Sequence, residues 1–205
     1  MRSVPSRGSR SSRSRAGQKL AGHDRILSAA YKLFVRRGVR AVGIDEIISS
    51  ANVAKATFYR HFRSKDELIL AFLHRREHVW TRGLLEAEVL RRAATPRLRL
   101  LAIFDVLDDW FHTRDFEGCP FIASVAQAVE PQDRVRREAV AQLAVIRSFV
   151  RRLATEGGVP EPARFAASWQ TLMAGSIVMA LSGDRLAARR ARRTGQLLLS
   201  ASAAA

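Results

Sequence analysis

Apolar side chains recur at helical spacing along most of the chain, and no strand-like alternation lasts for more than a few residues. The first apolar stripe follows Asp24, a candidate N-cap, and consists of Ile26, Leu27, Ala30, Leu33 and Phe34. Steps of three and four residues are typical of one buried helix face. This helix is predicted to end at Gly38, since glycine can adopt the left-handed conformation that closes many helices.

Two short helices are predicted next, over residues 44–51 and 55–61. Asn52 tolerates positive φ and can form the tight turn between them. Phe58 is expected to point inward from the second helix. Two short helices joined by a tight turn indicate a helix-turn-helix, whose second helix enters the major groove of DNA.

The remainder of the chain is predicted to be helical as well. Ser64 and Glu67 have the spacing of a capping box, which marks the start of the next helix. The apolar pattern and the Pro and Gly positions predict helices over residues 65–92, 96–112, 119–129, 133–156, 162–182 and 183–200.

Composition narrows the class of protein. The chain has 205 residues, enough for a small domain and a larger one with a sizeable core. The single cysteine, Cys119, excludes an internal disulfide and fits a reducing cytoplasm, where we expect the protein to reside. The most apolar run, residues 172–181, is too short to span a bilayer.

The formal net charge is +16, and part of it is concentrated at the N-terminus. Residues 1–22 carry six basic side chains and no acidic one, in a Ser-, Arg- and Gly-rich context that favours a disordered arm. Such an arm either reaches DNA beside the helix-turn-helix or adds only nonspecific attraction. The sequence leaves both readings open.

The segment around the short helices resembles the DNA-binding domain of the TetR family of bacterial transcriptional regulators. The resemblance rests on Gly38, the run 45–47, the run 53–62 (VAKATFYRHF) and the run 64–68 (SKDEL). Three positions depart from the family pattern. Asn52 replaces the usual turn glycine, Ala54 the usual Ser or Thr, and Gly43 the usual Thr.

The resemblance implies an all-α fold of about nine helices, in which a three-helix DNA-binding domain precedes a larger ligand-binding and dimerisation domain. We assign residues 1–22 to the basic arm, 23–70 to the helix-turn-helix domain and 71–205 to the second domain. The expected partners are a second copy of the chain, a pseudo-palindromic double-stranded DNA operator and a small-molecule ligand. The expected function is a repressor that the ligand releases from its operator.

The side chains of the second short helix suit DNA contacts. Thr57 can reach a phosphate or a base edge, and Arg60 can read a guanine. Tyr59 and His61 can donate to phosphates, although alone each is more often a packing residue. The predicted DNA-binding residues are Lys55, Ala56, Thr57, Tyr59, Arg60, His61 and Lys65.

The C-terminal helices offer candidates for a ligand pocket and a dimer interface. Aromatic and soft apolar side chains suggest a pocket formed by Trp80, Phe104, Trp110, Phe111, Phe121 and Met173. With the family resemblance, a helical stripe suggests a dimer interface formed by Phe165, Trp169, Leu172, Ser176 and Leu197. Cys119 is a redox-sensor candidate, but a lone cysteine is more often a small buried residue.

Other classes of function find less support. The sequence has no metal-ligand cluster, phosphate-binding loop or nucleophile elbow, so we expect no metal, cofactor or catalysis. The adjacent Asp108 and Asp109 would point in different directions on a helix. A nonspecific architectural DNA-binding protein and a TetR-like regulator that works without a ligand remain as alternatives.

Overall fold

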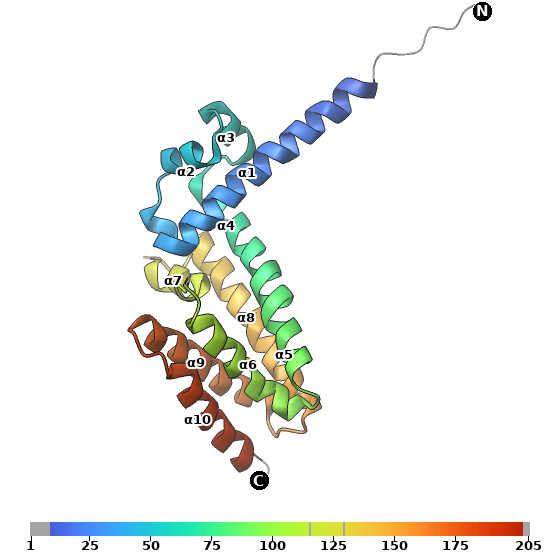
Figure 1. Cartoon of the computed structure of the whole chain (residues 1–205), viewed down its shortest axis with the longest axis vertical. Helices are drawn as coiled ribbons and strands as arrows, with labels where there is room; N and C mark the ends of the chain where they lie inside the picture. Colours follow the sequence, from blue (N-terminus) through green and yellow to red (C-terminus); the bar gives the residue numbers. More distant parts are fainter. Residues whose placement is uncertain (1–8, 115, 129, 203–205) are drawn as a thin grey trace, which may run out of the picture. The chain divides into compact units, whose positions relative to one another are not determined.

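A computed structural model of the chain describes residues 9–114, 116–128 and 130–202 (Figure 1). These residues form helices and no strands, which confirms the predicted all-α class. The helices are α1 (Ser9–Ala41), α2 (Ile44–Ala51), α3 (Lys55–His61), α4 (Lys65–Arg76), η1 (Glu77–Glu86), α5 (Ala87–Arg92), α6 (Pro96–Phe111), α7 (Pro120–Gln127), α8 (Arg134–Glu156), α9 (Pro162–Leu181) and α10 (Ala187–Ala201). The chain divides into two compact units, unit 1 up to Phe72 and unit 2 from Leu73.

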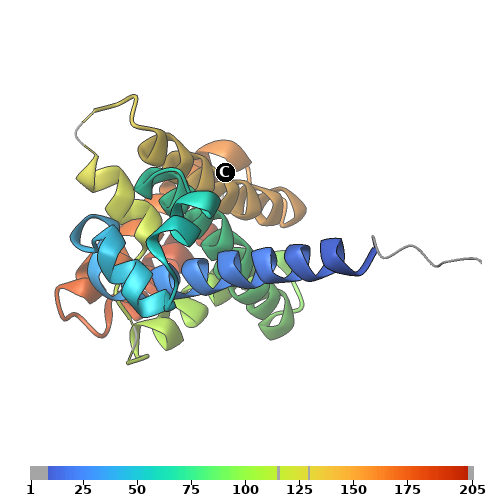
Figure 2. The same ribbon diagram turned by 90° about the horizontal axis from the view of Figure 1, so that it is seen from above.

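In unit 1, α2 and α3 both pack on α1, whose N-terminal turns extend beyond them (Figures 1 and 2). Helix α1 begins at Ser9, so the backbone of residues 9–22 is helical, whereas the sequence assigned it to a disordered arm. No proline interrupts this stretch, and its arginines and alanine are good helix formers. Residues 1–8 of the predicted arm lie outside the described residues.

The turn residues of unit 1 behave as their chemistry predicts. Gly38 has φ 77° and interrupts the helical backbone near the end of α1, and Asn52 has φ 49° between α2 and α3. At the start of α4, the Glu67 amide donates to the Ser64 hydroxyl over 3.2 Å. The Glu67 carboxylate accepts from the Arg63 amide at 2.6 Å rather than from that of Ser64. The capping box is therefore present, with its second bond shifted by one residue.

The predicted helix over residues 65–92 is continuous, but its middle part is a π-helix. Helices α4, η1 and α5 follow one another without a break, and η1 uses the wider turn of the π-helix. Its buried residues are Trp80, Thr81 and Leu85. Sequence periodicity did not predict the π-helix, because Trp80 and Thr81 each fit a series of ordinary four-residue steps.

The core of unit 2 is formed by α6 together with α8, α9 and α10. Trp169 of α9 is fully buried, with its ring centroid 5.1 Å from that of Phe104 on α6. Gly195 lets α10 approach these rings, because a Cβ there would lie 2.7 Å from Trp169 and 3.1 Å from Phe104. Close packing around one indole therefore fixes the relative positions of α6, α9 and α10.

Two helices of unit 2 differ from their predicted bounds. Helix α7 ends at Gln127 because Ala128 is extended, and α10 begins at Ala187 after a turn. The arginines of α10 form ion pairs within unit 2, namely Arg189–Asp108, Arg190–Asp184 and Arg192–Asp105.

The contact at Gly195 predicts that any larger side chain at this position destabilises the protein. Gly195→Ala should destabilise the protein by about 1–3 kcal/mol, because the added methyl group overpacks the contact with two large rings. Thr194→Ala, an exposed neighbour on the same helix, should change stability by no more than about 0.5 kcal/mol. Chemical denaturation of both variants measures the difference, and equal stabilities would contradict the close approach of α10.

Candidate functional site

The helix-turn-helix is held by a small aromatic and aliphatic core. Ile47 of α2 and Phe58 of α3 are fully buried, and Phe62 is nearly so. The rings of Phe58 and Phe62 lie 6.1 Å apart. Because Phe58 faces inward, the neighbouring side chains of α3 point to the outside of unit 1.

The outward face of α3 contains most of the predicted DNA-binding residues. Lys55, Ala56, Tyr59 and Arg60 are exposed, and Thr57 is half-buried. The Arg60 guanidinium donates to the Thr57 hydroxyl at 3.3 Å, so these two side chains form one polar group. Nζ of Lys55 lies 3.5 Å from Oδ1 of the exposed Asp45. Such a surface ion pair is weak and leaves the ammonium group accessible.

His61 occupies a different position from the other candidates. It is half-buried, and its Nε2 lies 2.9 Å from where a Cβ of Gly22 would stand. Its ring centroid is 6.0 Å from that of His23, which stacks on Phe62 at 5.0 Å. Nε2 of His61 therefore faces α1, and this geometry favours a packing role for that side of the ring.

Lys65 is also turned toward the protein. Its Nζ donates to the carbonyl of Arg40 at 3.1 Å, which ties the start of α4 to the end of α1. Partial burial lowers the pKa of Lys65, with a further lowering by the nearby charge of Arg40. The position of Lys65 therefore supports the geometry of unit 1 directly, and its contact with DNA stays a prediction.

The two helices of the motif begin without side-chain caps. Gly43 and Ala54 occupy the N-cap positions of α2 and α3 in extended conformations, and neither has a hydroxyl or carboxylate to offer. The first amides of α3 thus keep donors that a phosphate oxygen can accept. This feature follows directly from the two departures noted in the sequence.

In unit 2, the predicted pocket residues fall into separate groups. Trp80, Trp110 and Phe111 form an aromatic cluster with Phe116, in which the two indoles lie 4.6 Å apart. Phe104 instead packs on Trp169 in the α6–α9–α10 core. Phe121 of α7 and Met173 of α9 are buried. Ring contacts thus join three of the six predicted residues, and the pocket stays a prediction.

Sequence reasoning missed a buried arginine in this region. Arg76 is 7% exposed, and its guanidinium carbon lies 5.2 Å from the Trp80 ring and 5.6 Å from the Trp110 ring. A signal was present, because Arg76 continues the four-residue steps from Leu68 and Phe72. Cation–π contacts with two indoles offset part of the cost of burying its charge.

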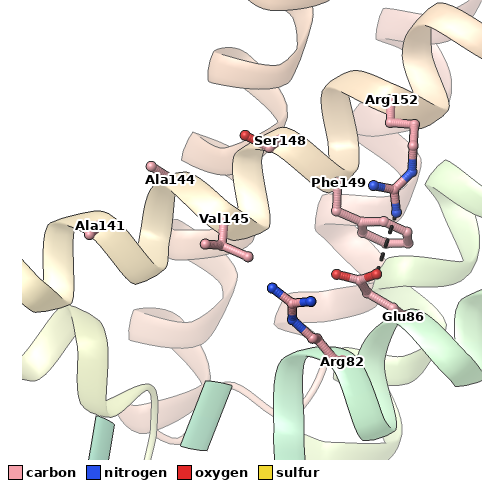
Figure 3. Close-up of a pocket in the computed structure, with 8 residues that line it drawn as sticks. All are labelled: Arg82, Glu86, Ala141, Ala144, Val145, Ser148, Phe149 and Arg152. Atoms are coloured by element: carbon pink, nitrogen blue, oxygen red, sulfur yellow. Dashed lines mark hydrogen bonds and ion pairs between the residues drawn. The ribbon is translucent and has the colours of Figure 1, made fainter. Parts of the chain in front are cut away.

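A pocket of about 320 Å³ lies between η1 and α8 (Figure 3). It is lined by Arg82, Glu86, Ala141, Ala144, Val145, Ser148, Phe149 and Arg152, none of which the sequence predicted. Arg152 pairs with Glu86 at 3.4 Å, and Arg82 pairs with Glu77 at 2.5 Å. The two cationic side chains of this pocket thus already hold carboxylates.

Cys119 and most of the predicted dimer residues are inside unit 2. Burial raises the pKa of the Cys119 thiol and so disfavours the reactive thiolate. This environment argues against a role of Cys119 as a redox sensor. Phe165, Trp169 and Ser176 are buried among the helices of the same chain, which leaves them little or no surface for a partner. Leu197 is 71% exposed and remains a candidate.

Comparison with known proteins identifies the class. The sequence profile of the bacterial regulatory proteins of the tetR family matches residues 26–72, which contain the helix-turn-helix. The transcriptional activator FasR of Mycolicibacterium smegmatis is 38% identical over 121 residues, or 58% of this chain and 54% of FasR. The chain therefore aligns with about half the length of that relative.

Solved structures of TetR-family regulators resemble this chain over most of its length. A TetR-family regulator from Streptomyces coelicolor is 26% identical with a TM-score of 0.79, covering 89% of this chain and 96% of that one. A TetR regulator from Streptomyces avermitilis is 28% identical with a TM-score of 0.78, covering 88% and 97%. Residues 26–72 therefore form a DNA-binding domain of the TetR type, and the chain has the all-α fold of TetR-family transcriptional regulators. Among the described residues, every helix is too short or too polar to cross a bilayer.

The uncapped start of α3 gives a testable consequence. Ala54→Ser should stabilise the protein by about 0.5–2 kcal/mol, because a hydroxyl at this extended N-cap can accept from a free amide of α3. Ala56→Ser, the same change inside the helix, should be neutral or slightly destabilising. Chemical denaturation gives the stabilities, and hydrogen exchange of the α3 amides locates the effect. A gain that is equal at both positions would argue against capping.

Proposed function

We propose that the protein is a homodimeric, sequence-specific repressor that a small-molecule ligand releases from a pseudo-palindromic operator. The observation that carries the DNA-binding part is the outward face of α3. There Lys55, Tyr59 and Arg60 are exposed around the Arg60–Thr57 hydrogen bond, on a helix with an uncapped N-terminus. This combination suits phosphate contacts at the helix start and base contacts further along.

A dimer is supported by the exposed surface of α9 and α10, two helices that pack side by side. Thr171, Gly175 and Val178 follow one another along the exposed side of α9, while Leu186 and Leu197 are exposed at α10. Small and apolar residues on a helix pair suit a two-fold, self-complementary interface. Two copies of α3 would then contact two half-sites of the operator.

Ligand control is supported by the connectivity of the long helix. The division between the units falls after Phe72, inside α4, so α4 belongs to both units. A ligand that shifts η1 within unit 2 would act on the same continuous helix that begins in unit 1. Because FasR is named as an activator, activation is the second candidate. Deleting the gene separates the two, since loss of a repressor raises target transcription and loss of an activator lowers it.

The DNA contacts predict different effects for two neighbouring side chains. Lys55→Ala should weaken binding on all sequences and lower the salt slope by roughly one unit, because a phosphate contact carries no base information. Arg60→Ala should relax preference at one base pair by about 1–3 kcal/mol if a bidentate contact to guanine is lost.

Operator sequences for this test come from selection on random DNA, followed by titrations at several salt concentrations. The matched control is Lys32→Ala, an exposed lysine of α1, which should leave both the slope and the preference unchanged. A uniform loss from Arg60→Ala would assign Arg60 to the DNA backbone.

The proposed dimer surface is tested at Leu197. Leu197→Glu should shift the protein toward monomer, because it places a charge in an apolar interface, and should weaken binding to a two-half-site operator. Leu90→Glu, a change at an exposed leucine of α5, is the control. Sedimentation measures the oligomeric state, and a Leu197→Glu protein that stays dimeric would exclude this surface.

A further inference from the structure

The partner of Arg60 on the outward face of α3 is a neutral hydroxyl group. Nη2 of Arg60 donates to Oγ1 of Thr57, three residues earlier on the same helix, at 3.3 Å. Other cations of unit 1, Lys55 and Arg37, pair with carboxylates. Helix α3 contains no acidic residue, and no ion pair within the described residues involves Arg60. The contact with Thr57 therefore orients the guanidinium without compensating its charge.

The direction of the Thr57 hydroxyl is set by packing on the other side of the same side chain. The methyl carbon Cγ2 of Thr57 lies 3.6 Å from the point that a Cβ of Gly22 would occupy, so the methyl group faces α1. Threonine is branched at Cβ, which restricts its χ1 rotamers. With the methyl group against α1, the hydroxyl lies on the side of Arg60. The close approach of α1 at Gly22 thus determines where the hydroxyl points.

An oriented arginine has an advantage in reading DNA. An exposed arginine side chain samples many rotamers, and it loses this freedom when it binds a base. A hydrogen bond that already exists in the free protein lowers this entropic cost. The guanidinium has five N–H donors, so those that Thr57 does not engage remain for a bidentate contact with a guanine.

The neutral character of the partner matters as well. A carboxylate would also orient the guanidinium, but it would reduce the positive charge that attracts the DNA phosphates. A hydroxyl orients Arg60 and leaves its full charge available.

We propose that Thr57 is a positioning residue, which presets the Arg60 side chain for reading one base pair of the operator. This inference rests on the sequence-specific DNA binding proposed above. From the sequence, Thr57 was expected to contact a phosphate or a base edge itself. The two roles differ in a measurable way, because a positioning residue acts only through Arg60 and only at the base pair that Arg60 reads.

The first test removes the hydroxyl and keeps the shape of the side chain. Thr57→Val should lower discrimination at the base pair read by Arg60 by about three- to tenfold, the range of one net hydrogen bond. The salt slope should stay unchanged, because no phosphate contact is lost. Thr57→Ser keeps the hydroxyl but loses the methyl group that orients it, so its discrimination should be intermediate. Titrations of operators changed at one base pair at a time give these values, and melting temperatures check that the variants fold alike.

A double-mutant cycle separates positioning from a direct contact. In the Arg60→Ala background, Thr57→Val should have no further effect on base preference, because its effect passes through Arg60. An equal effect of Thr57→Val in both backgrounds would assign Thr57 to a base of its own and overturn the proposal. A uniform loss on all sequences with a lower salt slope would assign Thr57 to a phosphate and overturn it as well.

A measurement on the free protein does not depend on DNA. NMR relaxation of the Arg60 Nε–H group should show a more mobile side chain in Thr57→Val than in the unchanged protein. Arg63, an exposed arginine directly after α3, is the matched control and should not change. Arg60 mobility that is the same with and without the Thr57 hydroxyl would refute this inference but retain the DNA-binding regulator. Binding of the unchanged protein to DNA without any base preference would instead refute the proposed function.

Discussion

The path of the long helix from Lys65 to Arg92 is the constraint on which unit 2 depends. The buried residues of its first part follow four-residue steps that end at Arg76 and Trp80, and a second series of such steps starts at Thr81 and continues to Leu85. This shift by one residue falls inside η1, whose wider turn keeps both series on one side of the helix. π-Helical segments are rare in proteins, and they occur frequently at functional sites. Here it places Trp80 and Thr81 inside unit 2, directly after a buried arginine.

Burying these polar groups destabilises the folded state of the protein. A buried hydroxyl without a partner costs about 1–3 kcal/mol, and a buried charge requires compensation. Elsewhere in unit 2 the chain uses apolar close packing, as around Trp169, where Gly195 leaves no spare space. Unused buried polar groups therefore occur both in this core, where the Trp169 N–H has no partner among the described residues, and beside η1, where the Thr81 hydroxyl has none.

Local features of the fold were predictable from the sequence, and long-range ones were not. The bounds of α2 and α3 were predicted because Asn52 and the flanking residues act through short-range backbone chemistry. Helical periodicity also identifies an apolar stripe, but it does not say which helix covers it. For this reason Trp169, predicted at a dimer surface, is in the core, where Phe104 packs on it. The π-helix depends on the same long-range packing, so periodicity alone did not predict it, whereas the four-residue steps from Leu68 and Phe72 already indicated a buried side chain at Arg76.

The distribution of charge bears on the alternative of a nonspecific DNA-binding protein. A net charge of +16 suggests a broadly basic surface, but the structure shows that arginines of α10 are paired with acids. Arg189 and Arg192 hold Asp108 and Asp105 of α6, so their charges contribute to the packing of unit 2. Counterion release depends on cations that can reach phosphates, and the exposed cations of α3 stand beside a hydroxyl and an aromatic side chain suited to specific contacts. The net charge of +16 already subtracts every acidic side chain, so the position of the exposed cations of α3, and not the size of the charge, supports a localised DNA-binding surface.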